Sequence, residues 1–166
     1  TILEVDASGN IIQGTSNAGI YLGVTSATAS NLLADYEEGT WTPAFASTSA
    51  TFAYASRGGT YTKVGRLVML SFLILLSGSP GGTTSNGVVI SGLPFNSATL
   101  VGTYHGGNIG HYFNINLSQT GVMVYQTASG TATVELKVVG DNLGETGVLA
   151  SHLNSNAQIR GQIIYH

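Results

Sequence analysis

The chain is poor in charge and contains no cysteine. Only 8% of its 166 residues are charged, whereas an ordinary globular domain has about 25%. Without cysteine there is neither a disulfide framework nor a thiolate metal site. Its 5 basic residues are too few for a strong phosphate-binding footprint, so nucleic acid is not an expected partner. Because surface charge keeps a monomer of this size soluble, the shortage predicts that much of the surface is hidden in an oligomer.

Long hydrophobic runs are also missing. The longest, Leu67–Leu76, is apolar except at Ser71 and has about half of the roughly 20 residues that a membrane-spanning helix needs, so no membrane insertion is expected. A strand with one wet face would alternate apolar and polar side chains, and this run does not. The turn signal Val64-Gly65 just upstream favours a strand over a buried helix. We interpret the run as the central strand of an antiparallel sheet, with one face in the subunit core and the other against a partner chain.

The first 35 residues differ in character from the rest. Short strand-like pieces at Ile2–Val5 and Ile11–Gln13 flank the turn cluster Asp6–Asn10, and Ile20–Val24 follows. So little apolar material is not expected to bury a core alone. Residues 1–35 are therefore predicted to be a short β-rich segment, the end of a shaft whose strands pair between chains. Because the chain starts at Thr1 within such a piece, we expect it to be a fragment of a longer protein.

A dense acidic group and the only tryptophan lie next to this boundary. Gly39 and Pro43 predict a bend rather than a regular element over residues 39–43. Glu37 and Glu38 could act as an acid–base pair or bind a hard cation. Adjacent residues point in different directions, however, so a structural role is favoured. Trp41 is expected to anchor the base of the domain that follows.

From Ala44 onward strand signals recur at short intervals, separated by polar turns such as 77–87 and 140–142. The expected strands are Thr51–Ser56, Thr60–Lys63, Arg66–Leu76, Val88–Ser91, Leu100–Tyr104, Tyr112–Leu117, Gly121–Gln126, Thr131–Val139 and Gln158–Tyr165. This pattern predicts an all-β, antiparallel β-sandwich domain of the jelly-roll kind over residues 36–166.

The segment with the most binding chemistry is the predicted loop Tyr104–Tyr112. The aromatic faces of Tyr104 and Tyr112 could stack on sugars, Asn108 offers an amide, and His105 and His111 offer imidazoles. Two histidines without a nearby carboxylate are an incomplete zinc set, and the phosphate-binding lysine and hydroxyl of a P-loop are missing, so neither metal nor cofactor is expected. The alternative, a hairpin loop whose aromatics pack on neighbours, stays open beside a receptor site. No Gly-x-Ser-x-Gly elbow or triad pattern occurs, so no catalytic residues are expected.

Four motifs occur in order: YEEGTWTP at 36–43, GTYTKVGR at 59–66, ISGLPF at 90–95 and IRGQIIY at 159–165. Together they resemble the C-terminal head domains of bacteriophage tail fibres and tailspikes, from residue 36 to the C-terminus. The resemblance implies a homotrimer of heads similar to tumour-necrosis-factor-like trimers, in the virion tail, attached to an upstream fibre shaft. It implies binding to a host cell-surface glycan or outer-membrane protein, with no enzymatic activity. The alternative is a non-catalytic trimerisation domain of a tailspike depolymerase whose enzymatic part lies upstream.

Overall fold

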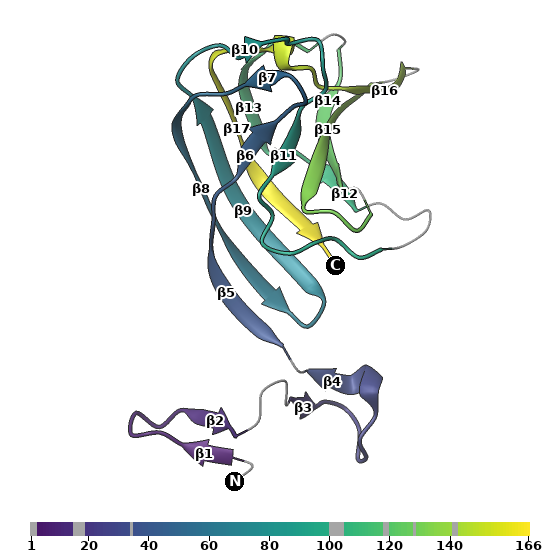
Figure 1. The fold of residues 1–166 in the computed structure, drawn as a ribbon. Coiled ribbons are helices and arrows are strands. Elements are labelled where there is room, and N and C mark those ends of the chain that lie inside the picture. Colours follow the sequence, from purple (N-terminus) through teal and green to yellow (C-terminus); the bar gives the residue numbers. More distant parts are fainter. Residues whose placement is uncertain are drawn as a thin grey trace.

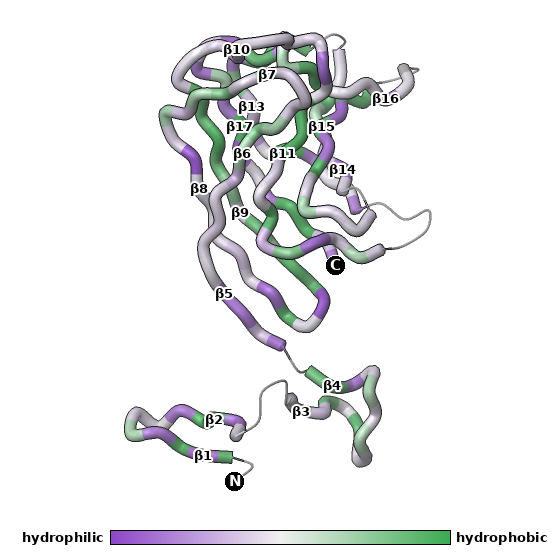
Figure 2. Tube along the Cα trace, in the orientation of Figure 1, coloured by the Kyte–Doolittle hydropathy of each residue, from purple (hydrophilic) through white to green (hydrophobic). Residues whose placement is uncertain are grey.

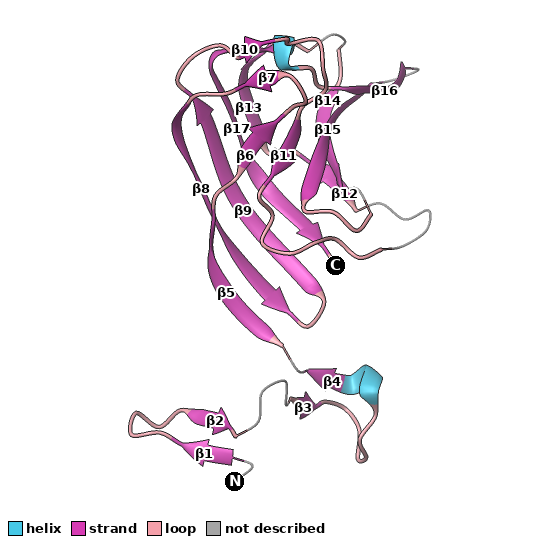
Figure 3. Cartoon of the chain, viewed as in Figure 1, coloured by secondary structure: helices cyan, strands magenta, loops and turns pink. Residues whose placement is uncertain are grey.

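The computed structural model describes residues 3–14, 19–33, 35–99, 105–117, 120–127, 129–140 and 143–166. Strands dominate these residues, and the helical elements among them are two single 3₁₀ turns, Ala29–Asn31 and Ala150–His152 (Figure 3). None of the described helices is long and apolar enough to cross a membrane. The all-β prediction is therefore confirmed.

The long apolar run is the middle strand of a five-stranded antiparallel sheet. The strands in order are β13 (His111–Ile115), β17 (Leu153–Tyr165), β9 (Leu67–Leu76), β8 (Tyr54–Val64) and β5 (Tyr36–Trp41). Gly65, with a positive φ of 57°, closes the hairpin between β8 and β9. Both the predicted central strand and its preceding turn are confirmed.

A second antiparallel sheet packs over the first, as Figure 1 shows. Its order is β12 (Gly106–Asn108), β14 (Val122–Thr127), β15 (Thr133–Gly140), β11 (Val89–Ser91) and β6 (Ala44–Ala46), with β16 (Leu143–Gly147) paired to β15. A small pair, β7 (Ala50–Thr51) with β10 (Gly81–Gly82), lies at one end. Two packed antiparallel sheets agree with the predicted sandwich; jelly-roll connectivity stays a prediction.

The core lies between the two sheets, where Figure 2 shows the hydrophobic stretches of both. Every second residue of β9 is buried there: Val68, Leu70, Phe72, Ile74 and Leu76. On the second sheet, β15 buries Val134, Leu136 and Val138 in the same core. Trp41 packs edge-on against Phe72, with ring centroids 6.1 Å apart, and its Nε1–H donates to the carbonyl of Ser71 at 3.0 Å.

Residues 36–41 form the regular strand β5, so the predicted bend is wrong over residues 39–41, while residues 42 and 43 follow the strand. The strand pairs with β8 from Tyr36 opposite Val64 to Trp41 opposite Gly59. Gly39 lies inside it because the ring of Tyr61 covers its α-carbon, where an added Cβ would lie 2.6 Å from the ring. Glycine is typical of turns, but at position 39 it leaves space for the aromatic ring of Tyr61.

The other strand predictions differ from the structure mainly in their bounds. Thr51–Ser56 and Thr60–Lys63 were expected as separate strands, but β8 joins Tyr54 to Val64 through a register shift near Ser56. The expected strand Leu100–Tyr104 lies outside the described residues. The short strands β6, β12 and β16 were not expected.

Four short strands precede the sandwich as two separate hairpins. β1 (Leu3–Val5) pairs with β2 (Ile11–Gln13), and β3 (Ile20–Tyr21) pairs with β4 (Leu32–Leu33). Their apolar side chains are largely exposed. Two-stranded hairpins are marginally stable alone in water. The predicted boundary at residue 35 stays a prediction.

Replacing Phe72 with alanine is expected to lower the free energy of unfolding by about 3–5 kcal/mol, because it empties a buried aromatic site. Phe72 is 5% exposed and Phe113 is 55% exposed, so Phe113→Ala is the matched control and should change stability by about 0.5 kcal/mol or less. Chemical denaturation of both variants checks this. Equal stability of Phe72→Ala and the parent would contradict the described core.

Candidate functional site

The predicted loop at 104–112 is a crossing between the two sheets. Gly106–Asn108 is strand β12, paired with β14, and His111 opens β13 in the five-stranded sheet. Between them Ile109 is buried, and its backbone N–H donates to the carbonyl of Met123 at 3.1 Å. The alternative of a hairpin loop is therefore wrong, because the chain passes from one sheet to the other there.

This crossing separates the five predicted site residues. Tyr104 lies outside the described residues. Asn108 ends β12 in the second sheet, His105 directly precedes that strand, and His111 belongs to the five-stranded sheet. Tyr112, next to His111, is partly buried and packs against the core. The structure thus leaves three of the five, His105, Asn108 and His111, on or near the surface.

His105 and Asn108 line a hollow of about 540 Å³ beside β12, here called the histidine hollow. Its other lining residues are Gly106, Gly107, Tyr125, Gln162 and Ile164. The Tyr125 hydroxyl accepts a hydrogen bond from the backbone N–H of Ile164 at 2.9 Å, which fixes the floor. The His105 ring packs edge-on against His166, with centroids 4.2 Å apart.

His111 lines a second hollow of about 750 Å³ on the outer face of the five-stranded sheet, here called the glycine hollow. Its lining residues are Gly58, Gly59, Thr60, Ser71, Phe72, Leu73, Gly110, His111, Arg160, Gly161 and Gln162. Gln162 lines both hollows, so they adjoin each other. His105, Asn108 and His111 therefore border two neighbouring hollows, here together called the depression, although they come from different sheets.

Sequence reasoning missed the polar residues of β17 that complete this depression. Arg160 and Gln162 were identified only as part of a motif. Their spacing of two residues places them on one face of a strand, and that alternation was the available signal. Which face pointed outward depended on the pairing with β9, where Arg160 is opposite Leu73 and Gln162 is opposite Ser71.

The depression offers hydrogen-bonding groups more than reactive ones. The Thr60 and Ser71 hydroxyl oxygens are 2.7 Å apart. The Nδ1 of His111 is buried and makes no hydrogen bond within the described residues. Within the described ranges no group of three or more histidine, aspartate or glutamate residues could hold a metal ion. The arrangement can recognise a polar ligand through hydroxyl, amide, imidazole and guanidinium groups.

The acidic residues before Trp41 are not part of this depression. On strand β5 Glu37 and Glu38 point to opposite faces, and each accepts a hydrogen bond from a tyrosine hydroxyl, Glu37 from Tyr61 and Glu38 from Tyr36. These bonds raise the pKa of both tyrosines. The two carboxylates are therefore not arranged as a pair for acid–base chemistry.

The outer faces of the two sheets differ in charge. On the second sheet, Lys137 Nζ lies 2.9 Å from Glu135 Oε2 and 3.6 Å from Glu145 Oε1. On the five-stranded sheet, two neighbouring rows of side chains form an exposed surface, here called the apolar patch. Its members are Tyr36, Val64, Leu67, Met69 and Ile164, which are 37–63% exposed.

Comparison with known proteins agrees with the class that these features define, an all-β sandwich of two antiparallel sheets. No protein-family model matches the sequence, and no curated protein matches it. A solved structure with a similar fold is the crystal structure of the Dettilon tailspike protein, with a TM-score of 0.61 and 16% sequence identity. The similarity covers 79% of this chain and 24% of that one. The chain therefore spans about a quarter of the tailspike, and the likeness shows a shared fold.

Burial, and then the neighbouring imidazole of His166, lowers the pKa of His105 below its ordinary value of 6.5. Burial also lowers the pKa of His152. Because the folded chain disfavours the protonated rings, its free energy of unfolding is highest above the unfolded pKa and declines as pH falls through 6.5 toward the folded pKa.

We therefore expect the melting temperature to decline between about pH 7.5 and 5.5, and to decline less in His105→Gln. Scanning calorimetry at several pH values measures this, with Asn108→Gln as a control that keeps both histidines. An identical pH dependence in His105→Gln and the parent would contradict the role assigned to the partly buried His105 ring.

Proposed function

We propose that the chain is part of a bacteriophage tailspike or tail fibre, in the virion tail, and that it forms a homotrimer contacting the host surface. The fold shared with part of a tailspike and the four head-domain motifs support this assignment. The observation that carries it is the apolar patch, because a face of this kind on a soluble protein marks an interaction site.

In this proposal the apolar patch packs against other copies of the chain. Its five side chains stand in two adjacent rows, Tyr36–Val64–Leu67 and Met69–Ile164, and Glu38 lies beside them. The outer face of the second sheet, with its Glu135–Lys137–Glu145 cluster, is suited to water. Closed rings of identical chains are the usual form of such assemblies. Three copies joined through the apolar patch give the proposed trimer.

Residues 1–35 extend this association along a shaft. The two N-terminal hairpins expose Val5, Ile11 and Ile20 by 59–69%. Pairing or packing with the same hairpins of neighbouring chains would cover these side chains. In this proposal residues 1–35 are the end of the shaft, and residues 36–166 are the head.

The receptor is a glycan or an outer-membrane protein of the host, and the head binds it without catalysing a reaction. The residues proposed for contact are Tyr104, His105, Asn108, His111 and Tyr112. His105, Asn108 and His111 border the depression on the sandwich surface, where mixed aromatic, amide and imidazole groups can bind polar ligands.

Placing a charge in the apolar patch should break the assembly. Leu67→Glu is expected to give monomers at micromolar concentration, because the buried carboxylate would have no partner in the interface. Val122→Glu is the matched control, since Val122 also opens a strand and is 52% exposed against 45% for Leu67. Light scattering after size exclusion measures the mass. Retention of the parent's mass by Leu67→Glu would exclude the patch as the interface.

Asn108→Ala and Tyr104→Ala are expected to weaken host adsorption while leaving the mass and the melting temperature unchanged. Losing one well-placed contact typically costs about 1–3 kcal/mol, and three copies multiply the loss through avidity. Competition of each purified variant with phage adsorption measures this, with Gln13→Ala in the N-terminal hairpin as control. Undiminished competition by both variants would leave trimerisation as the proposed function and remove receptor binding from these residues.

A further inference from the structure

One glycine of β8 lies at the edge of the five-stranded sheet, just beyond Gly59, where the pairing with β5 ends. Gly58 lies within β8, opposite Leu73, and an added Cβ would meet no atom within 4 Å. The adjacent Gly59 is different, because its Cβ would lie 2.2 Å from the Ser71 carbonyl oxygen. Glycine weakens a strand interior, and one without a packing reason marks a place where a ligand or another backbone approaches closely.

The groups around Gly58 are arranged in rows across the sheet. One row runs from Gly58 through Leu73 and Arg160 to His111. The next row holds Thr60, Ser71 and Gln162. Without a side chain at Gly58, the glycine hollow opens above the strands between these polar groups.

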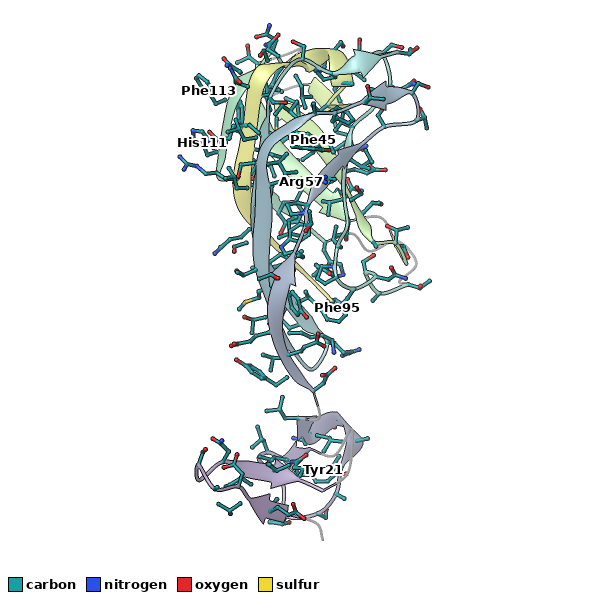
Figure 4. All side chains as sticks on the ribbon, turned by 60° about the vertical axis from the view of Figure 1, so that its left-hand side comes forward. Tyr21, Phe45, Arg57, Phe95, His111 and Phe113 are labelled. Carbon is teal, nitrogen blue, oxygen red and sulfur yellow. The ribbon has the colours of Figure 1, made fainter. Side chains whose placement is uncertain are left out.

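Two groups in the hollow, the Arg160 guanidinium and the His111 Nδ1, make respectively no ion pair and no hydrogen bond with the residues that the structure describes. Arg160 is exposed and makes no ion pair with any described residue. His111, directly opposite Arg160, keeps a buried Nδ1 without a hydrogen bond among the described residues. Phe113, two residues further along β13, exposes 55% of its surface. In Figure 4, His111 and Phe113 lie on the same outer side of the sandwich, away from Phe45 in its interior.

This combination fits an acidic sugar. A guanidinium binds a carboxylate through two parallel hydrogen bonds, while hydroxyls and an amide pair with sugar hydroxyls. An exposed aromatic ring offers an apolar face to a sugar ring. The volume of about 750 Å³ exceeds what a lone anion needs. Gln162 connects this hollow to the histidine hollow, so a chain of sugars could continue across it.

We propose that the glycine hollow binds a carboxylate-bearing sugar unit of a host surface polysaccharide, with Arg160 on the carboxylate and Gly58 providing the space. The proposal rests on the proposed host-surface function and names the ligand class. The apolar patch occupies the two rows beyond Thr60, Ser71 and Gln162, and the hollow extends from that polar row to the other side. A neighbouring subunit in the hollow is the alternative that the test distinguishes.

The test titrates the assembled protein with a uronic-acid tetrasaccharide and with the same tetrasaccharide after reduction of its carboxyl groups. Isothermal calorimetry should show uronate binding weakened at least about tenfold in Arg160→Gln and in Gly58→Val, where the new side chain fills the hollow. Arg57→Gln is the matched control, since Arg57 lies next to Gly58 but stacks on the Tyr54 ring, 4.2 Å from its centroid. It should bind like the parent.

The remaining outcomes either overturn the proposal or show that sugar binding in the hollow does not depend on trimer formation. Equal affinity for the acidic and the reduced tetrasaccharide, or parent-like binding by Arg160→Gln, removes the carboxylate site. Dissociation of the oligomer by Gly58→Val with no loss of mass in Leu67→Glu would make the hollow the subunit interface and overturn it. A monomeric parent that still binds the uronate in an Arg160-dependent way supports the hollow and contradicts only the trimer.

Discussion

The structure depends on a strand that is apolar on both faces. β9 buries Val68, Leu70, Phe72, Ile74 and Leu76 against the second sheet, at the centre of the core. The opposite face carries Leu67, Met69, Leu73 and Leu75, and no described element of the chain covers it. The chain has too few charged residues for a charged surface elsewhere to offset the exposed apolar face and keep a monomer in solution. The need to cover the second face follows from the same sequence run that builds the core.

The uncovered face is not uniform, and its division suggests two uses. Its rows nearest the β8–β9 turn hold the apolar patch, with Thr62 and Glu38 beside Met69 and Ile164 in the second row. The rows that follow are polar, with hydroxyls, an amide, a guanidinium and an imidazole around a strand glycine. Assembly through the first part would leave the second beside the subunit boundary. Association and recognition can therefore share one sheet, and they meet at Ile164, which belongs to the apolar patch and also lines the histidine hollow.

Sequence reasoning predicted the features that depend on local periodicity. The lack of a wet face in Leu67–Leu76, with Gly65 before it, was enough to predict the central strand and its hairpin turn. Sequence reasoning failed where contacts between residues distant in the sequence determine the local structure. Gly39 looked like a bend but lies within β5 under the Tyr61 ring, and the segment from His105 to His111 looked like a loop but crosses between sheets. Gly58 and Gly59 cannot be told apart from the sequence. Only strand pairing shows that Gly59 lies against Trp41, whereas Gly58 lies in the open hollow.

The central claim is that three copies of the chain together cover the part of the second face of β9 that carries Leu67 and Met69. The most direct test is native mass spectrometry of the unmodified chain at low micromolar concentration. The account predicts a species of about three times the chain mass of 17.1 kDa, persisting as the protein is diluted. A single species at the mass of one folded chain would contradict it.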